Sequence, residues 1–286
     1  MKRLIVNADD FGFTRGVNAG IIRAFKSGIV TSATIMANGE AFDDAVRLAR
    51  ENPGLGVGCH LAVVGERAVA PASEVRSLAP GGILPPTLTQ LVIKLARGLV
   101  STEEIARELR AQIECVMNAG ITPTHLDTHK HSHTHPQVME ALVQVAAEFN
   151  IKCVRNPFEK VFGSAWRKPQ AKWAYLKQSA LSAAIAPAAI RFKMLAREHG
   201  IKTPQRFLGV RRTGMLDSAA IQSMMKSLRD GTAELMCHPG ICDDDLARAR
   251  TRLKRERERE LAAVGDPALR QFAHERGIEL INYREL

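Results

Sequence analysis

The alternation of short apolar runs with helical segments is the feature that most restricts the fold of this chain. Apolar, strand-like runs occupy residues 4–7, 29–36 and 55–61, and apolar residues recur at helical spacing over residues 17–27 and 42–50. Strands separated by single helices at such short intervals are typical of parallel βα units. The same pattern predicts later helices at residues 88–99, 105–116, 136–146 and 219–228, and later strands at residues 124–127, 151–155, 233–237 and 278–283.

Three segments stand out from this alternation. Residues 64–86 contain four prolines and three glycines, which indicates a long functional or mobile loop. Residues 157–212 interleave aromatic with basic residues and predict amphipathic helices, which either pack on the body or form a substrate-access or membrane-surface element. Residues 248–259 alternate basic residues with glutamate and predict a solvent-exposed helix. We therefore predict one domain over residues 1–286, a distorted TIM-like (β/α) barrel with an insert at 157–212.

The composition limits the classes of partner. The 286 residues are 45% hydrophobic and carry a net charge of +10, which suits an acidic partner such as an anionic membrane surface. We expect no nucleic-acid binding, because the charged run at 248–259 alternates in sign.

The sequence predicts a cytoplasmic protein. It has five cysteines without a CxxC spacing, no secretory signal and no apolar stretch of about 20 residues. Contact with the inner face of the membrane and a homodimer are left open.

Side chains suited to metal binding or acid–base chemistry follow four of the predicted strands. Asp9 and Asp10 follow the first strand, His60 ends the third, and His129 and His238 follow later ones. In a β/α barrel the active site is built at this edge, from the ends of different strands. Two histidines and a carboxylate leave coordination positions open for water and substrate, so the pattern predicts a catalytic metal site. One aspartate can bind the metal while the other acts as a general base.

Residues 125–135 hold five of the nine histidines of the chain. His125 and Asp127 form an H-x-D pattern, which is also found in the facial triad of non-haem iron oxygenases. Those enzymes are mostly all-β barrels, whereas this chain alternates strand with helix. The cluster is too dense for every member to bind a metal. We interpret four of its residues as substrate-binding or ligand-orienting groups around His129: His125, Asp127, His131 and His133.

Five short motifs resemble the YdjC-like carbohydrate deacetylase family, which includes the chitooligosaccharide deacetylases. They are VNADDFG at 6–12, GIVTSAT at 28–34, GVGCH at 56–60, THLDTH at 124–129 and MCHP at 236–239. Arg257 and Glu260 also fit the family, whereas residues 160–212 match its chitooligosaccharide branch poorly. Residues 38–39 and 155–159 are most similar to the hopanoid-biosynthesis-associated branch.

The resemblance implies a TIM-like barrel that removes an acetyl group from an N-acetylated sugar with a divalent metal, usually magnesium, with zinc as the alternative. It implies Asp10, His60 and His129 as the metal ligands. The choice of Asp10 over Asp9 follows the wider polysaccharide deacetylases. Lys130 stands where some relatives carry another histidine, so the role of that position is open.

We hypothesise a metal-dependent N-deacetylase in which Asp9 deprotonates the attacking water and His238 protonates the leaving amine. An N-acetylglucosaminyl hopanoid is the expected substrate, and the basic insert would then contact an anionic membrane. A soluble chitooligosaccharide is the alternative substrate.

A metal-dependent glycosidase or isomerase on the same barrel is a second class of function, although a retaining glycosidase needs two carboxylates about 5 Å apart on different strands. A non-catalytic sugar- or lipid-binding protein is the third class, and it would not need metal ligands beside an acid and a base.

Overall fold

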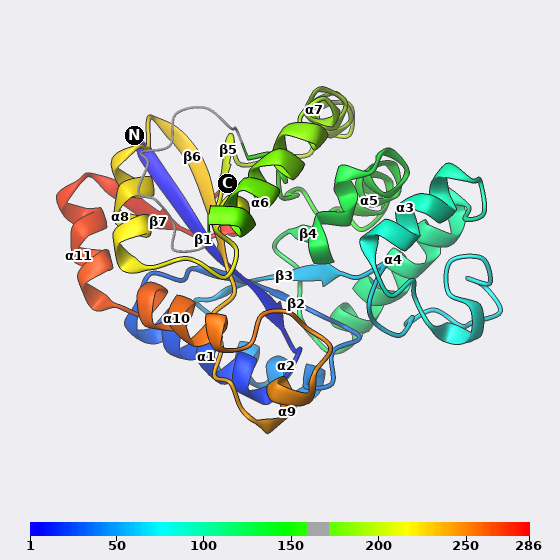
Figure 1. The fold of residues 1–286 in the computed structure, drawn as a ribbon, viewed down its shortest axis with the longest axis horizontal. Helices are drawn as coiled ribbons and strands as arrows, with labels where there is room; N and C mark the ends of the chain where they lie inside the picture. The colour runs from blue at the N-terminus through cyan, green and yellow to red at the C-terminus, as the bar shows by residue number, and fades with distance from the viewer. Residues whose placement is uncertain (160–171) are drawn as a thin grey trace.

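The computed structural model describes residues 1–159 and 172–286, in which a curled parallel sheet lies inside a layer of helices (Figure 1). The strands are β1 Lys2–Phe11, β2 Ser32–Ile35, β3 Gly56–Leu61, β4 Leu126–Thr128, β5 Arg206–Leu208, β6 Gly231–Cys237 and β7 Ile278–Ile281. They pair in the order β4-β3-β2-β1-β6-β5, with β7 also beside β1, and all of these pairings are parallel. Single-residue bridges at Leu126–Val154 and Cys153–Lys202 extend the pairing beyond β4. The predicted distorted TIM-like barrel is confirmed.

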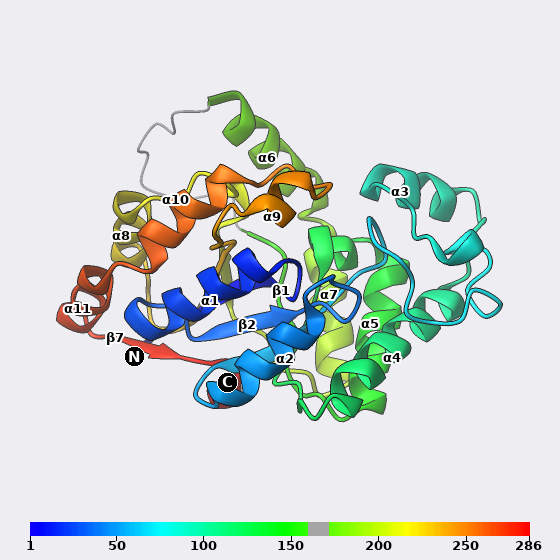
Figure 2. The same cartoon turned by 90° about the horizontal axis from the view of Figure 1, so that it is seen from below.

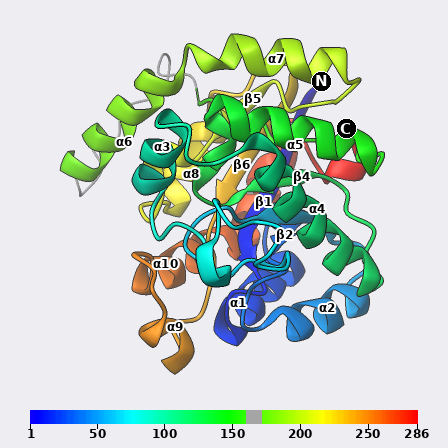
Figure 3. The same ribbon diagram turned by 90° about the vertical axis from the view of Figure 1, so that its right-hand side faces the viewer.

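Helices cover the outside of the sheet, as parallel strands with crossover connections require (Figures 2 and 3). They are α1 Arg15–Ser27, α2 Phe42–Glu51, α3 Leu88–Ala96, α4 Thr102–Asn118, α5 Pro136–Glu148, α6 Lys172–Ile185, α7 Ala188–Glu198, α8 Ser218–Lys226, α9 Asp244–Arg248, α10 Arg255–Val264 and α11 Pro267–Glu275. Short 3-10 helices lie at η1 Pro80–Gly82, η2 His129–Thr134, η3 Val210–Arg212 and η4 Tyr283–Glu285. Thr14 caps α1 and Asp217 caps α8, because the side chain of each accepts a hydrogen bond from a first-turn N–H that has no carbonyl partner within its helix.

The long segment between β3 and α3 is anchored by two glutamates of α4. Ser101 caps α4 by accepting the Glu104 N–H at 3.1 Å. The Glu104 carboxylate accepts the N–H groups of residues 77–78 at 2.8 and 2.9 Å. Buried Glu108 accepts those of residues 69–70 at 2.9 and 3.0 Å. These bonds fix the loop over the carboxyl ends of the strands, where its Gly65, Glu66 and Pro86 line a cavity.

Side chains of β1 divide between the barrel interior and the surrounding helices, as the two-residue period of a strand requires. Leu4, Val6 and Ala8 belong to the main apolar core. Ile5 instead packs in a small separate cluster with Cys153, Ile281 and Tyr283. Further along the same face of β1, Asn7 and Asp9 are buried and polar. The barrel interior therefore has an apolar base and a polar upper half.

The two adjacent aspartates lie at an irregularity of β1. The register between β1 and β2 shifts between Ala8 and Phe11, and Asp10 takes a φ of 70°. A bulge turns a side chain that regular alternation would direct to the opposite face. Asp9 and Asp10 consequently line the same cavity although they are neighbours in sequence. The strand extends through both residues, whereas the sequence predicts that it ends before them.

Three other predicted elements differ from the structure. Apart from Arg248, the last residue of α9, the predicted helix at 248–259 is helical only from Arg255, where α10 begins, because residues 249–254 form a non-helical connection that buries Leu253. The range 157–212 contains α6 and α7 but also β5, which pairs with β6, and its residues 160–171 lie outside the described chain. The predicted strand at 151–155 is reduced to isolated bridges. Within the described residues, no helix combines the length and apolarity needed to cross a membrane.

Candidate metal centre

Three side chains from distant parts of the sequence converge on one point. Asp10 Oδ1 lies 3.3 Å from both His60 Nε2 and His129 Nδ1, and the two ring nitrogens are 3.2 Å apart. Donor atoms about 2.0–2.2 Å from one divalent ion are about 3.0–3.4 Å apart in octahedral or tetrahedral sites. Asp10 Oδ1 is buried and forms no hydrogen bond within the described chain. A buried carboxylate oxygen without a partner is costly, so this donor set fits a divalent metal.

The atoms of these ligands that face away from the shared point are held by other side chains. Arg257 of α10 donates to Asp10 Oδ2 at 2.6 Å. His60 Nδ1 lies 2.7 Å from Asp127 Oδ1, an arrangement in which the ring donates to the carboxylate and directs Nε2 toward the metal position. Burial lowers the pKa of His60, but Asp127, Asp10 and Asp9 together raise it to about 10 in the metal-free site. Metal binding would therefore release a proton from this ring.

Backbone strain concentrates around the same residues. Four non-glycine residues have a positive φ in the described chain, and three of them, Asp10, Lys130 and His131, line the same cavity. Such conformations cost of the order of 1–3 kcal/mol each and persist where surrounding contacts impose them. Lys130 and His131 form the sharp turn that directly follows His129. The strain thus accompanies the placement of two of the three candidate metal ligands, Asp10 and His129.

Asp9 is held in a second, fully buried cluster beneath the donors. Arg155 donates to both of its carboxylate oxygens, at 2.6 and 2.7 Å, and Asn7 Nδ2 donates to Oδ1 at 2.9 Å. The same guanidinium contacts Asp127 at 2.5 Å and Glu234 at 2.8 Å. Burial would raise the pKa of Asp9, but Arg155 holds it far below its usual range, so this carboxyl is ionised at neutral pH.

Arg155 is a functional candidate that the sequence interpretation missed as a site residue. Its available signal was a cation at the end of the predicted strand 151–155, on the same edge as the other polar residues. The three carboxylates that surround it come from β1, β4 and β6. Their convergence depends on the closure of the barrel, which the order of residues does not reveal.

A cavity of about 430 Å³ connects these groups to the surface. Asp9, Asp10, His60, His129 and His238 all line it. His238 directly follows β6, and its backbone N–H donates to the buried Glu260 of α10 at 2.6 Å. The ring Nδ1 lies 3.8 Å from the same carboxylate. The structure thus brings together the five residues predicted as metal ligands, base and acid.

The four other predicted residues occupy two positions. His131 lines the cavity and meets Phe207 edge to face, with ring centroids 5.5 Å apart. The other three lie behind the cavity wall. His125 stacks on Tyr283 at 3.6 Å, Asp127 contacts His60, and His133 Nδ1 lies 2.6 Å from Thr128 Oγ1. His131 is therefore placed to contact a substrate, whereas the others are placed to support the residues that do.

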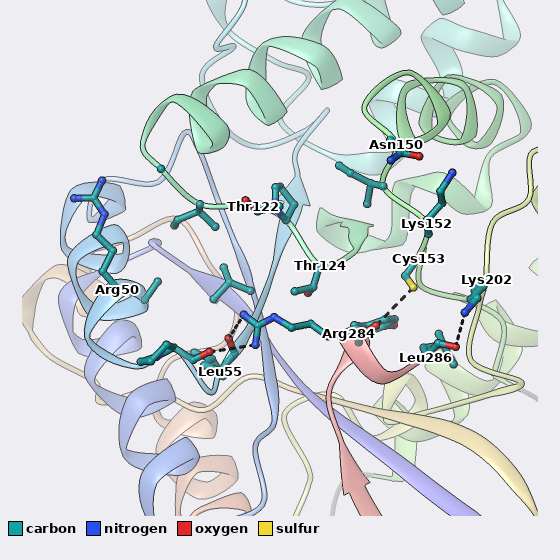
Figure 4. A pocket seen from close by; sticks show the side chains of 18 residues that line it. Arg50, Leu55, Thr122, Thr124, Asn150, Lys152, Cys153, Lys202, Arg284 and Leu286 are labelled. Carbon is teal, nitrogen blue, oxygen red and sulfur yellow. Dashed lines mark hydrogen bonds between the residues drawn. The ribbon is translucent and has the colours of Figure 1, made fainter.

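A larger cavity of about 620 Å³ lies near the start of β3 and β4 (Figure 4). Lys202 and Arg284 on its wall donate to backbone carbonyl groups, at 3.1 Å to Leu286 and at 3.1 Å to Leu55. Its described lining contains no histidine, aspartate or glutamate side chain. The smaller cavity is therefore the candidate active site, because it holds the acid–base and metal-binding groups.

Comparison with known sequences gives the family. Residues 3–275 match the family described as YdjC-like protein. This chain belongs to the YdjC-like family. A protein from Geobacillus stearothermophilus named carbohydrate deacetylase is 36% identical over 282 residues, 98% of this chain and 96% of the relative. A chitooligosaccharide deacetylase from Salmonella typhimurium is 41% identical over 149 residues, which cover 52% of this chain and 57% of that protein. The predicted family is confirmed.

A solved structure with the same fold comes from Enterococcus faecalis V583. That protein, named as a candidate cellobiose-phosphate cleavage protein, superimposes with a TM-score of 0.78 at 26% identity, and the match covers 99% of this chain and 98% of that one. The described parts of the chain, on both sides of residues 160–171, therefore share the fold of a solved protein.

Proposed function

We propose that this YdjC-like protein is a metal-dependent deacetylase that removes the acetyl group from an N-acetylated carbohydrate. The observation that carries the proposal is the buried Asp10 Oδ1, which accepts no hydrogen bond in the described chain and faces His60 and His129, with Asp9 and His238 on the same cavity. A relative named carbohydrate deacetylase spans 98% of the chain and supports the reaction class. Deacetylation needs a carbonyl to be polarised, a water to be deprotonated and an amine to be protonated, and the cavity has side chains for both proton transfers and a donor set for an ion that would polarise the carbonyl.

The chain supplies the proton transfers. Asp9 accepts the proton of the attacking water, whose oxygen adds to the acetamide carbon. Arg155 donates to both oxygens of Asp9 and Asn7 donates to Oδ1 as well, so Oδ2 is the oxygen that keeps a further lone pair for this proton. His238 donates a proton to the nitrogen as the carbon–nitrogen bond breaks, and acetate and a free amine result. A divalent ion held by Asp10, His60 and His129 would polarise the carbonyl and lower the pKa of water in the cavity.

The hydrogen bonds around the two aspartates support this division of roles. Arg257 engages Asp10 Oδ2, so the remaining oxygen faces the two histidines. Asp9 is held by Arg155, which keeps it ionised, as the acceptor of a proton must be. Magnesium is the metal expected from the family resemblance, and zinc is the alternative, which two imidazole donors favour on ligand chemistry.

The substrate is a finer part of the proposal. The resemblance of residues 38–39 and 155–159 to the hopanoid-associated branch supports an N-acetylglucosaminyl hopanoid. The relative from Salmonella typhimurium, which is named for chitooligosaccharides, supports the alternative. We also keep the proposal of a single domain with an insert at 157–212, of which α6 and α7 are the described helical part.

Acetate release from N-acetylglucosamine-containing glycans and glycolipids, with and without a chelator, tests the reaction. We expect release that stops with EDTA and returns when Mg²⁺ or Zn²⁺ is added. Asp9→Asn should abolish release while one metal ion still binds. The matched control is Asp245→Asn on α9, an exposed residue away from the cavity lining. Unchanged release from fully chelated protein, or full activity of Asp9→Asn, would overturn the mechanism.

A further inference from the structure

Two helices present large apolar side chains to solvent. On α6 the exposed fraction is 85% for Trp173 and 52% for Leu176, and on α3 it is 39% for Val92 and 45% for Ile93. The exposed residues of α6 are three apart and share one helix face. On α3, Leu91 and Leu95 are buried, so the opposite face of that helix is the exposed one. Apolar side chains grouped in this way usually mark a contact surface.

Both helices border the mouth of the candidate active site. Pro86, just before α3, lines the cavity. α6 packs on η3, whose Val210 lines the cavity as well, and Arg211 Nε of η3 donates to Ser179 of α6 at 3.0 Å. Figures 2 and 3 show α6 and α3 on the same side of the molecule. The helices that carry the apolar residues therefore lie beside the opening rather than on a remote face.

Cations lie among these apolar residues. Lys177 is exposed one residue after Leu176 on α6. Arg250 and Arg252, between α9 and α10, are exposed and line the same mouth. We define the mouth surface by its exposed residues: Val92, Ile93, Trp173, Leu176, Lys177, Arg250 and Arg252. This combination of apolar side chains with cations complements a bilayer that carries anionic lipid.

We propose that the mouth surface docks the protein onto an anionic lipid bilayer, with Trp173 and Leu176 inserted among the lipids. A second copy of the chain fits the surface poorly, because an isologous contact brings together two surfaces whose charged residues are all cations. The whole chain has a net charge of +10, which adds long-range attraction to an anionic surface. Docking opens the active-site cavity toward the bilayer. The inference thus deepens the proposed function, because a lipid-linked acetylated sugar could enter without leaving the membrane.

Co-sedimentation of the full chain with vesicles tests the docking. We expect binding to vesicles containing phosphatidylglycerol and little binding to pure phosphatidylcholine at low salt, with binding weakened by added salt. The double variant Trp173→Glu, Leu176→Glu should lower the partition coefficient by about tenfold or more, because two inserted apolar side chains are replaced by anions. Met117→Glu is the matched control, since Met117 is 41% exposed on α4. The control should bind as the unmodified protein does.

Two further readouts separate the alternatives. Acetate release from a water-soluble acetylated sugar should be equal in the double variant and the unmodified protein, which shows that the variant is folded. If neither releases acetate, the proposed function fails while the vesicle result still decides the docking. Equal vesicle binding by the unmodified protein and the double variant would overturn the inference. Gel filtration that shows a dimer of the unmodified protein and a monomer of the double variant would overturn it too, because a second copy would then cover the surface.

Discussion

At the scale of single residues, the candidate site is ordered by buried charged partners that hold its side chains. Arg257 holds Asp10, Asp127 holds His60, and Arg155 holds Asp9. Each contact is buried, so the remaining donor atoms, Asp10 Oδ1 and His60 Nε2, have a defined direction. The sequence revealed the functional residues by their position after strands. It did not reveal Arg155 or Arg257 as their partners, because an isolated arginine in sequence carries no sign that it will be buried.

The contact between Asp127 and His60 should control metal affinity. The negative charge of Asp127 orients the His60 ring and makes its Nε2 a stronger metal donor, and Asp127→Asn removes that charge. We expect metal affinity to fall by about 10–100-fold with the fold retained. Metal titration followed by calorimetry measures this, and Asp245→Asn on the surface is the control. An affinity equal to that of the unmodified protein would show that Asp127 does not orient the ligand.

Replacement of Arg155 should be severe because three carboxylates lose their shared cation. Arg155→Met leaves Asp9, Asp127 and Glu234 buried without it. We expect the free energy of unfolding to fall by about 3–5 kcal/mol, as measured by denaturant titration of the metal-free protein. Arg110→Met, which breaks an exposed pair with Glu148, should cost at most about 1 kcal/mol. Similar losses in the two variants would contradict the role of burial.

The pH dependence of stability should report Glu234. Burial raises its pKa from 4.5 to about 7, against the opposing effect of Arg155. Between these values the folded state holds the proton more tightly than the unfolded state, so this group destabilises the fold as pH rises from 4.5 to 7. Glu234→Gln cannot titrate. Its stability relative to the unmodified protein should increase across that window and then level off in thermal unfolding. A difference independent of pH would contradict the raised pKa.

At the scale of elements, periodicity identified most helices and strands because apolar spacing records which face is buried. It could not show the bulge of β1, since a bulge depends on pairing with β2 and leaves no periodic signal. It also started a helix at residue 248, whereas α10 begins at Arg255. The alternating charges of residues 248–259 suggested a uniformly exposed helix, whereas Arg257 is buried because it contacts Asp10.

One close contact between elements gives a prediction of its own. A Cβ on Gly58 of β3 would lie 2.5 Å from His125 Nδ1, so the strand needs a glycine beside that ring. We expect Gly58→Ala to lower the melting temperature, by an amount that corresponds to about 1–3 kcal/mol, because His125 must move away from Tyr283. At Gly54 a Cβ would meet Phe25 at an ordinary 3.4 Å, so Gly54→Ala should have a smaller effect. A larger loss of melting temperature in Gly54→Ala than in Gly58→Ala would show that His125 is not tightly packed against β3.

At the scale of the whole molecule, the barrel brings residues that are far apart in sequence close together. Asp10, His60 and His129 are contributed by the ends of β1, β3 and β4, and His238 by the end of β6. The alternation of strand and helix predicted both the barrel and the edge on which these residues meet. It could not predict which of the clustered histidines would face the cavity, because that depends on the positive φ angles at Lys130 and His131.

The number of metal ions bound per chain tests the central claim most directly. Equilibrium dialysis against Mg²⁺ and, separately, Zn²⁺, followed by elemental analysis, should give one tightly bound ion for the unmodified protein with at least one of the metals. His60→Ala should reduce that number to near zero. His274→Ala, an exposed histidine of α11, should leave it at one. Retention of one tightly bound ion by His60→Ala would contradict a metal centre built from Asp10, His60 and His129.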